Sequence, residues 1–120
     1  MGHIERGERA IQTARRELAE EVGLHAGAGH CVGFWALEQV HPYFLAEVDA
    51  VMLSPRFAAQ VTPGFEPLLD EEHDAARWVS RNEVDASFVW PGQRLSVREI
   101  VETLLDAHAP ARDLLRLTFD

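Results

Sequence analysis

Three glutamates near the start of the chain, Glu17, Glu20 and Glu21, have the spacing of neighbours on one face of a helix. Like charges at this spacing repel, and near a helix C-terminus the macrodipole also disfavours anions. Clustered carboxylate oxygens are, however, the ligands that Mg²⁺ and Mn²⁺ prefer. The spacing therefore predicts a divalent metal site. The alternative is a solvated acidic face with Arg15 and Arg16 as ion-pair partners.

A longer pattern surrounds these glutamates. It reads Gly2-x5-Glu8-x7-Arg16-Glu17-Leu18-x-Glu20-Glu21-x-Gly23-Leu24 and fills all nine fixed positions of the Nudix box, G-x5-E-x7-R-E-U-x-E-E-x-G-U, where U is aliphatic. The sequence therefore resembles the Nudix hydrolases over residues 2–24. That family cleaves nucleoside diphosphates linked to another group, using a divalent metal and a water nucleophile. The resemblance implies a phosphoanhydride hydrolase that requires Mg²⁺ or Mn²⁺.

The resemblance also implies individual roles for the residues of the box. Glu17 and Glu21 would be direct metal ligands, and Glu20 would be a ligand or would hold water. Arg16 would orient a catalytic carboxylate through a bidentate pair. Glu8 would tie the preceding loop to the helix without touching metal.

A fourth candidate acid lies far from the box. The segment from Glu72 and His73 to Trp78 resembles the Nudix branch acting on dATP-like triphosphates, dihydroneopterin triphosphate or dinucleoside polyphosphates. In that branch the glutamate before the histidine reaches the metal or activates water, which implies both roles for Glu72. Glu71 is the alternative equivalent, and a hydrated loop acid is the alternative interpretation. We expect His73 to be a partly buried structural residue, with polarisation of a phosphate or water as the alternative.

For several aromatic and basic residues outside the box we expect structural rather than catalytic roles. Phe34, Trp35 and Trp78 are expected in the core, with stacking on a base as the alternative. Arg56 and Arg94 are expected on the surface, with contacts to distal phosphates as the alternative.

Composition limits the classes of function. The 120 residues suit one domain, and 47% hydrophobic with 26% charged residues is typical of a soluble globular protein. The chain shows neither an apolar run of membrane-spanning length nor an apolar signal segment, and its single cysteine, Cys31, favours a cytoplasmic location. A net charge of −9 argues against polymeric nucleic acid as a partner. It allows a small nucleotide-like substrate, because bound metal reverses the local charge.

The elements that must position these residues follow from periodicity. Residues 9–22 have an apolar stripe at helical spacing, and Gly23 suits a left-handed C-cap. Strands are predicted at residues 31–40, 44–53 and 76–80. The further predictions are an irregular segment at 54–74, a loop with a helical turn at 82–92, and a helix with a Ser96–Glu99 capping box that ends at Pro110. The tail from 113 to 120 is compatible with helix or strand.

This order of elements predicts an α/β or α+β domain. The resemblance implies a single Nudix domain over residues 1–120, an α/β/α sandwich with a mixed sheet. In the family two or three strands precede the box, which here begins at Gly2, so we expect an N-terminally truncated fold. The competing hypothesis is a catalytically impaired remnant that binds a nucleotide or another chain. A homodimer or strand swap would then cover the exposed sheet edge.

Overall fold

The computed structural model describes residues 7–25, 27–73 and 75–118, and its contacts divide the chain into two compact units. The first unit comprises Met1–Phe34, Ala59–Arg77 and Leu117–Asp120, and the second comprises Trp35–Ala58 and Trp78–Arg116. All four candidate glutamates belong to the first unit. The box residue Gly2 lies outside the described residues. No described helix is long and apolar enough to cross a membrane.

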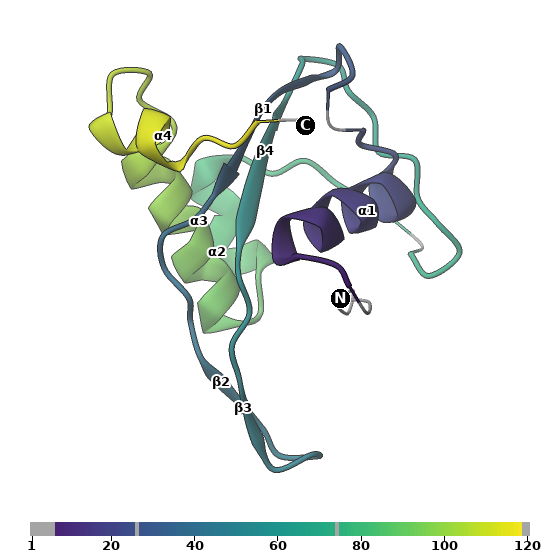
Figure 1. Ribbon diagram of the computed structural model, residues 1–120, viewed down its shortest axis with the longest axis vertical. Helices are drawn as coiled ribbons and strands as arrows, with labels where there is room; N and C mark the ends of the chain where they lie inside the picture. The colour runs from purple at the N-terminus through teal and green to yellow at the C-terminus, as the bar shows by residue number, and fades with distance from the viewer. Residues whose placement is uncertain (1–6, 26, 74, 119–120) are drawn as a thin grey trace. The chain divides into compact units, whose positions relative to one another are not determined.

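The first unit contains helix α1, Ala10–Val22, which confirms the predicted helix (Figure 1). Gly23 ends it with φ 72° and ψ 19°, the left-handed conformation that glycine adopts without steric cost. Its N–H donates to the Ala19 carbonyl at 3.2 Å, and the N–H of Leu24 donates to the Leu18 carbonyl at 3.2 Å. These bonds satisfy carbonyls that the helix end would leave unpaired.

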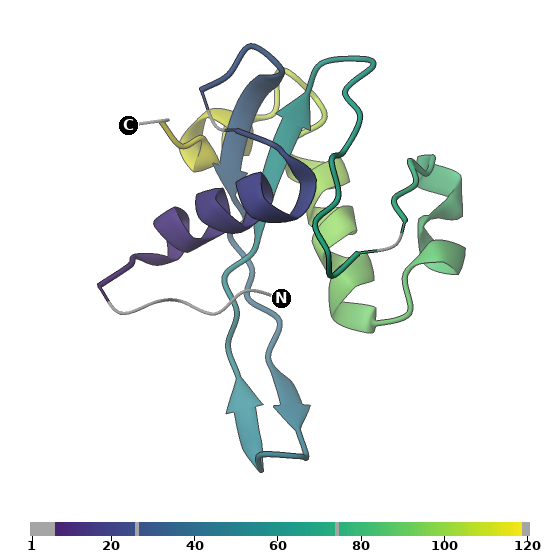
Figure 2. The same cartoon turned by 90° about the vertical axis from the view of Figure 1, so that its right-hand side faces the viewer.

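Strands β1, Cys31–Ala36, and β4, Phe57–Val61, form a two-stranded sheet and run in opposite directions (Figure 2). Phe34 and Trp35 of β1 are 1% and 2% exposed, which confirms them as core residues. The strand predicted to end at residue 40 ends at Ala36. Strand β4 lies inside the segment 54–74, which was predicted to be irregular. The prediction missed it because prolines at positions 55 and 63 flank a run that is too short to show a period.

The prediction of one continuous strand at residues 44–53 is wrong. The chain instead forms a hairpin of β2, Tyr43–Leu45, and β3, Ala50–Met52, paired antiparallel with Tyr43 opposite Met52. Asp49, at φ 51°, is the residue of the turn that adopts the left-handed region, which aspartate tolerates better than most side chains. The alternation of apolar residues continues through this turn and so conceals it. Phe44 and Val51 are paired on one face and are 61% and 66% exposed. On the other face Tyr43 is exposed, and Leu45, Ala50 and Met52 are half-buried.

The second unit also holds four helical elements. They are the 3₁₀ turn η1, Arg81–Glu83, and helices α2, Val84–Ser87, α3, Pro91–Thr103, and α4, Pro110–Leu115. The helical turn predicted within residues 82–92 is confirmed. Pro110 begins a helix rather than ending one, since proline suits a first helical turn. The undecided tail contains both alternatives, because after α4 Arg116 forms an antiparallel bridge with Trp35.

The predicted Ser96–Glu99 capping box is wrong, because α3 begins five residues earlier, at Pro91. The Ser96 hydroxyl donates to the Gly92 carbonyl at 3.0 Å. Glu99 is 9% exposed, and its carboxylate accepts the N–H groups of Glu38 and Gln39 at 2.6 and 3.1 Å. Glu99 therefore anchors the chain that follows β1 to α3.

The core of the second unit joins β1 to the helices. Trp35, Leu37 and Leu104 are buried together, with Ala58, Ile100 and Leu115 packed against them. The strand predicted at 76–80 is not formed, and Trp78 is 67% exposed rather than in the core. Helices combined with small antiparallel sheets confirm the α/β class.

Candidate metal and catalytic centre

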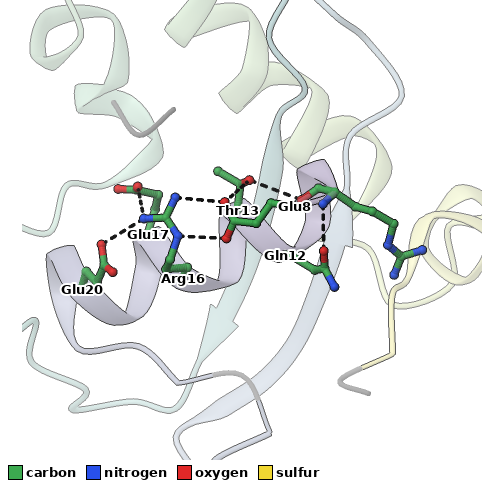
Figure 3. Close-up of polar contacts among 7 residues, drawn as sticks. Glu8, Gln12, Thr13, Arg16, Glu17 and Glu20 are labelled. Carbon is green, nitrogen blue, oxygen red and sulfur yellow. Dashed lines mark hydrogen bonds and ion pairs between the residues drawn. The ribbon is translucent and has the colours of Figure 1, made fainter. Parts of the chain in front are cut away.

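One arginine on α1 contacts three carboxylates (Figure 3). The Nε and Nη2 atoms of Arg16 donate to the two oxygens of Glu8 at 2.9 and 3.1 Å. Its Nη1 donates to Glu17 at 2.8 Å and to Glu20 at 3.2 Å. The bidentate pair expected of Arg16 is thus formed with Glu8, while single bonds hold Glu17 and Glu20.

Exposure separates these contacts into strong and weak ones. The side chains of Arg16, Glu8 and Glu17 are 24%, 19% and 20% exposed, whereas that of Glu20 is 57% exposed. Ion pairs weaken as solvent screens them. The pairs with Glu8 and Glu17 are therefore the ones that fix the guanidinium, and Glu20 remains adjustable.

Thr13 completes the anchoring of Glu8, and the sequence analysis missed it. Its hydroxyl donates to a Glu8 oxygen at 3.0 Å, and the residue is only 7% exposed. Thr13 precedes Arg16 by three residues, so the two side chains share a helix face. A polar residue on the face of the motif arginine was the signal available in the sequence. Glu8 thereby ties the loop before α1 to the helix, as its position in the motif implied.

The remaining box glutamate has a perturbed acidity. Burial raises the pKa of the Glu21 carboxyl above its ordinary value, and a hydrogen bond and charge repulsion from Glu17 raise it further. The positive charge of His73 offsets part of this rise in the pKa. The carboxyls of Glu17 and Glu21 are thus close enough to compete for negative charge, a conflict that a cation between them would relieve.

The segment before Glu72 is bonded to the C-terminal end of α1, and both views show the chain after β4 passing beside this helix end (Figures 1 and 2). Leu68 donates its N–H to the Val22 carbonyl at 2.8 Å, and Asp70 donates its N–H to the Glu21 carbonyl at 3.3 Å. A Cβ atom on Gly23 would lie 3.0 Å from the Cβ of Leu68. Glycine at position 23 therefore permits both the left-handed conformation that ends α1 and the close approach of the segment that contains Leu68.

Asp70 organises the residues that follow it. One carboxylate oxygen of Asp70 accepts the N–H of Glu72 at 3.1 Å and contacts Nδ1 of His73 at 2.6 Å. The hydrogen bond from Asp70 raises the pKa of His73, and the same bond lowers the pKa of Asp70. The side chain of His73 is 43% exposed, so it is more accessible than predicted. Glu71 and Glu72 are both exposed.

The donor set suits a hard divalent cation, since it consists of carboxylates, two of which compete for charge. Among residues 7–25, 27–73 and 75–118, no group of three or more His, Cys, Asp or Glu side chains is arranged to hold a metal ion. In this structure the single positive charge of Arg16 is shared among Glu8, Glu17 and Glu20. The metal roles of Glu17, Glu20, Glu21 and Glu72 stay predictions.

Two histidines outside the box, and the candidate Arg94, have structural partners. His25 donates its N–H to Nε2 of His30 at 3.0 Å, and the His30 ring stacks on Phe65 with centroids 5.0 Å apart. Arg94 donates to the carbonyls of Phe88 and Val89, both at 2.9 Å. Arg94 and Arg56 are half-buried rather than fully on the surface.

The chain is similar to known proteins in two comparisons. The NUDIX domain model matches residues 1–100 of the chain. A relative from Sus scrofa, named bis(5'-nucleosyl)-tetraphosphatase (asymmetrical), is 34% identical over 91 residues, a match that covers 68% of this chain and 54% of the relative. The chain thus spans about half the length of that relative. With most of its length matched by the family model, the chain belongs to the NUDIX family.

Proposed function

We propose that this chain hydrolyses a phosphoanhydride bond in a nucleoside diphosphate linked to another group, with water as nucleophile and Mg²⁺ or Mn²⁺ as cofactor. The observation that supports it is the gathering of acidic side chains at one helix end. Arg16 holds Glu17 and Glu20, Glu21 lies beside Glu17, and the segment carrying Glu72 is bonded to the Glu21 carbonyl.

A dinucleoside tetraphosphate is the substrate we favour. The relative named for that class is 34% identical to this chain. The name of the relative also specifies an asymmetrical reaction, which for this chain would yield a nucleoside triphosphate and a nucleoside monophosphate. Nucleoside and pterin triphosphates, which the sequence pattern equally allows, are the alternative substrates.

The cation would be held by Glu17 and Glu21, with Glu20 and Glu72 as further ligands or as holders of water. When bound, it would neutralise phosphate oxygens and acidify the attacking water. The chain's own side chains account for the rest. Arg16 keeps Glu17 in place through a 2.8 Å bond, and Glu8 keeps Arg16 in place through two.

The proton of the attacking water needs an acceptor within hydrogen-bond reach. Glu72 and Glu20 are both exposed carboxylates that can accept it. Burial and the neighbouring Glu17 raise the pKa of Glu21, and a cation held by this carboxylate would lower that pKa again.

The test is a substrate panel assayed with Mg²⁺, comprising a dinucleoside tetraphosphate, a nucleoside triphosphate and a pterin triphosphate. Turnover in ¹⁸O-water should place label in one product phosphate. Glu21→Gln should lower kcat by more than about 100-fold, beyond the loss typical for residues that only orient ligands. Glu66→Gln, an exposed acid of the same unit, is the matched control and should keep full activity. A folded Glu21→Gln variant with wild-type turnover would refute the metal role.

The partner implied by this proposal is a small nucleotide-like molecule. A cytoplasmic location, suggested by the single cysteine, is part of the same proposal.

A further inference from the structure

Asp70 contacts both the residues that follow it and the end of helix α1. A single oxygen, Oδ1, accepts the N–H of Glu72 at 3.1 Å and contacts Nδ1 of His73 at 2.6 Å. The carbonyl of Asp70 accepts the N–H of His73 at 3.3 Å. These contacts close a turn that fixes the main chain of the two residues after Glu71.

The same turn is attached to the helix that carries the box glutamates. The N–H of Asp70 donates to the Glu21 carbonyl at 3.3 Å, and two residues earlier Leu68 donates to the Val22 carbonyl at 2.8 Å. The side chain of Asp70 is only 25% exposed, whereas Glu72 is exposed. Asp70 therefore links the end of α1 to the main chain of Glu72, whose side chain is exposed.

We propose that Asp70 is a positioning residue, which holds Glu72 next to Glu21 for the reaction. This inference rests on the proposed function, since it assigns Asp70 a task within that site. Residues that orient a ligand or base, without touching the reacting atoms, can matter almost as much as the ligand itself. Both side-chain contacts use one oxygen, so an asparagine amide oxygen can replace it, while alanine cannot.

The kinetic test compares Asp70→Ala with Asp70→Asn. Asp70→Ala should lower kcat by about 10- to 100-fold with little change in KM, as expected when a supporting residue is lost. Asp70→Asn should retain kcat within about threefold of wild type, because the amide oxygen preserves the turn. Asp106→Ala is the matched control and should leave kcat unchanged, since the Asp106 carboxylate accepts the N–H of His108 at 2.9 Å in the same kind of turn in the other unit. An unchanged kcat in Asp70→Ala would overturn the proposal.

A double variant tests whether Asp70 acts through Glu72. In a Glu72→Gln background, Asp70→Ala should cause almost no further loss of kcat, because residues that act as a unit are not additive. A full additional loss of about tenfold or more would overturn the proposal, since Asp70 would then act independently.

Hydrogen exchange of the Glu72 amide provides a measurement that does not depend on turnover. The amide should exchange slowly in the wild type and in Asp70→Asn, and at least about tenfold faster in Asp70→Ala, because a hydrogen-bonded N–H is protected. Equal exchange in all three proteins would overturn the positioning role. A wild-type chain that turns over no substrate would instead refute the proposed function, whatever the exchange result.

Discussion

Replacing Gly23 by alanine tests the close approach between the end of α1 and the segment that carries Glu72. Two costs apply at this position. The residue has φ 72°, where an L-residue costs about 1–2 kcal/mol. The added Cβ would also lie 3.0 Å from the Cβ of Leu68, an atom next to the main chain that cannot rotate away. Such overpacking costs about 1–3 kcal/mol.

Gly64→Ala isolates the first of these costs. Gly64 has φ 86°, and a Cβ there would meet nothing within 4 Å. It should destabilise the protein by about 1–2 kcal/mol, reduced by the lower entropy of the unfolded chain. Gly23→Ala should cost about 1–3 kcal/mol more, which corresponds to roughly 4–12 °C in Tm for a domain of this size.

Urea and thermal unfolding of both variants provide the assay. Adding Leu68→Gly to Gly23→Ala removes the opposing Cβ and should recover most of the difference, so the two sites should show an interaction energy of about 1–3 kcal/mol. Gly23→Ala should also lower kcat, because the segment bearing Glu72 must move. Equal destabilisation by Gly23→Ala and Gly64→Ala, or strict additivity with Leu68→Gly, would refute the close approach.

Three further changes have predicted outcomes. Arg16→Lys keeps the charge but loses the two parallel N–H groups that bind Glu8, so it should lower the free energy of unfolding by about 1–2 kcal/mol. In a Glu8→Gln background most of that loss should disappear. Full additivity of the two changes would contradict the pairing of Arg16 with Glu8. The pKa of Glu21 is raised in the folded protein, so its contribution to stability is present below the ordinary pKa of 4.5 and is lost as pH rises through the raised pKa. Between about pH 4 and about pH 8 the free energy of unfolding should therefore fall less in Glu21→Gln than in the wild type. Parallel pH profiles would contradict this. Glu99→Ala removes a buried carboxylate that accepts two part-buried N–H groups and should cost about 2–4 kcal/mol. Exposed Glu102→Ala on the same helix should stay within about 0.5 kcal/mol in the same urea titration.

Features that depend on neighbouring residues were predictable. Helix α1 follows from an apolar stripe that ends at a glycine, and Gly23 adopts the conformation expected of it. The family resemblance implied a bidentate pair between Arg16 and a catalytic carboxylate, and the structure forms that pair with Glu8 instead.

Features that depend on distant residues were not predictable. Ser96 and Glu99 have the three-residue spacing of a capping box but do not form one, because Glu99 bonds to residues 38 and 39, far away in sequence. The hairpin was missed because Asp49 replaces the glycine that commonly marks such a turn. Asp70 was overlooked because its role appears only once its N–H is seen on the Glu21 carbonyl.

Binding of Mn²⁺, followed by electron paramagnetic resonance in the presence of a non-hydrolysable dinucleoside tetraphosphate, tests the central claim most directly. The account predicts that wild-type protein and Glu66→Gln bind the ion alike, and that Glu17→Gln and Glu21→Gln each weaken binding by at least about tenfold. Equal Mn²⁺ affinity in all four proteins would contradict the claim that the acidic end of α1 holds the catalytic metal.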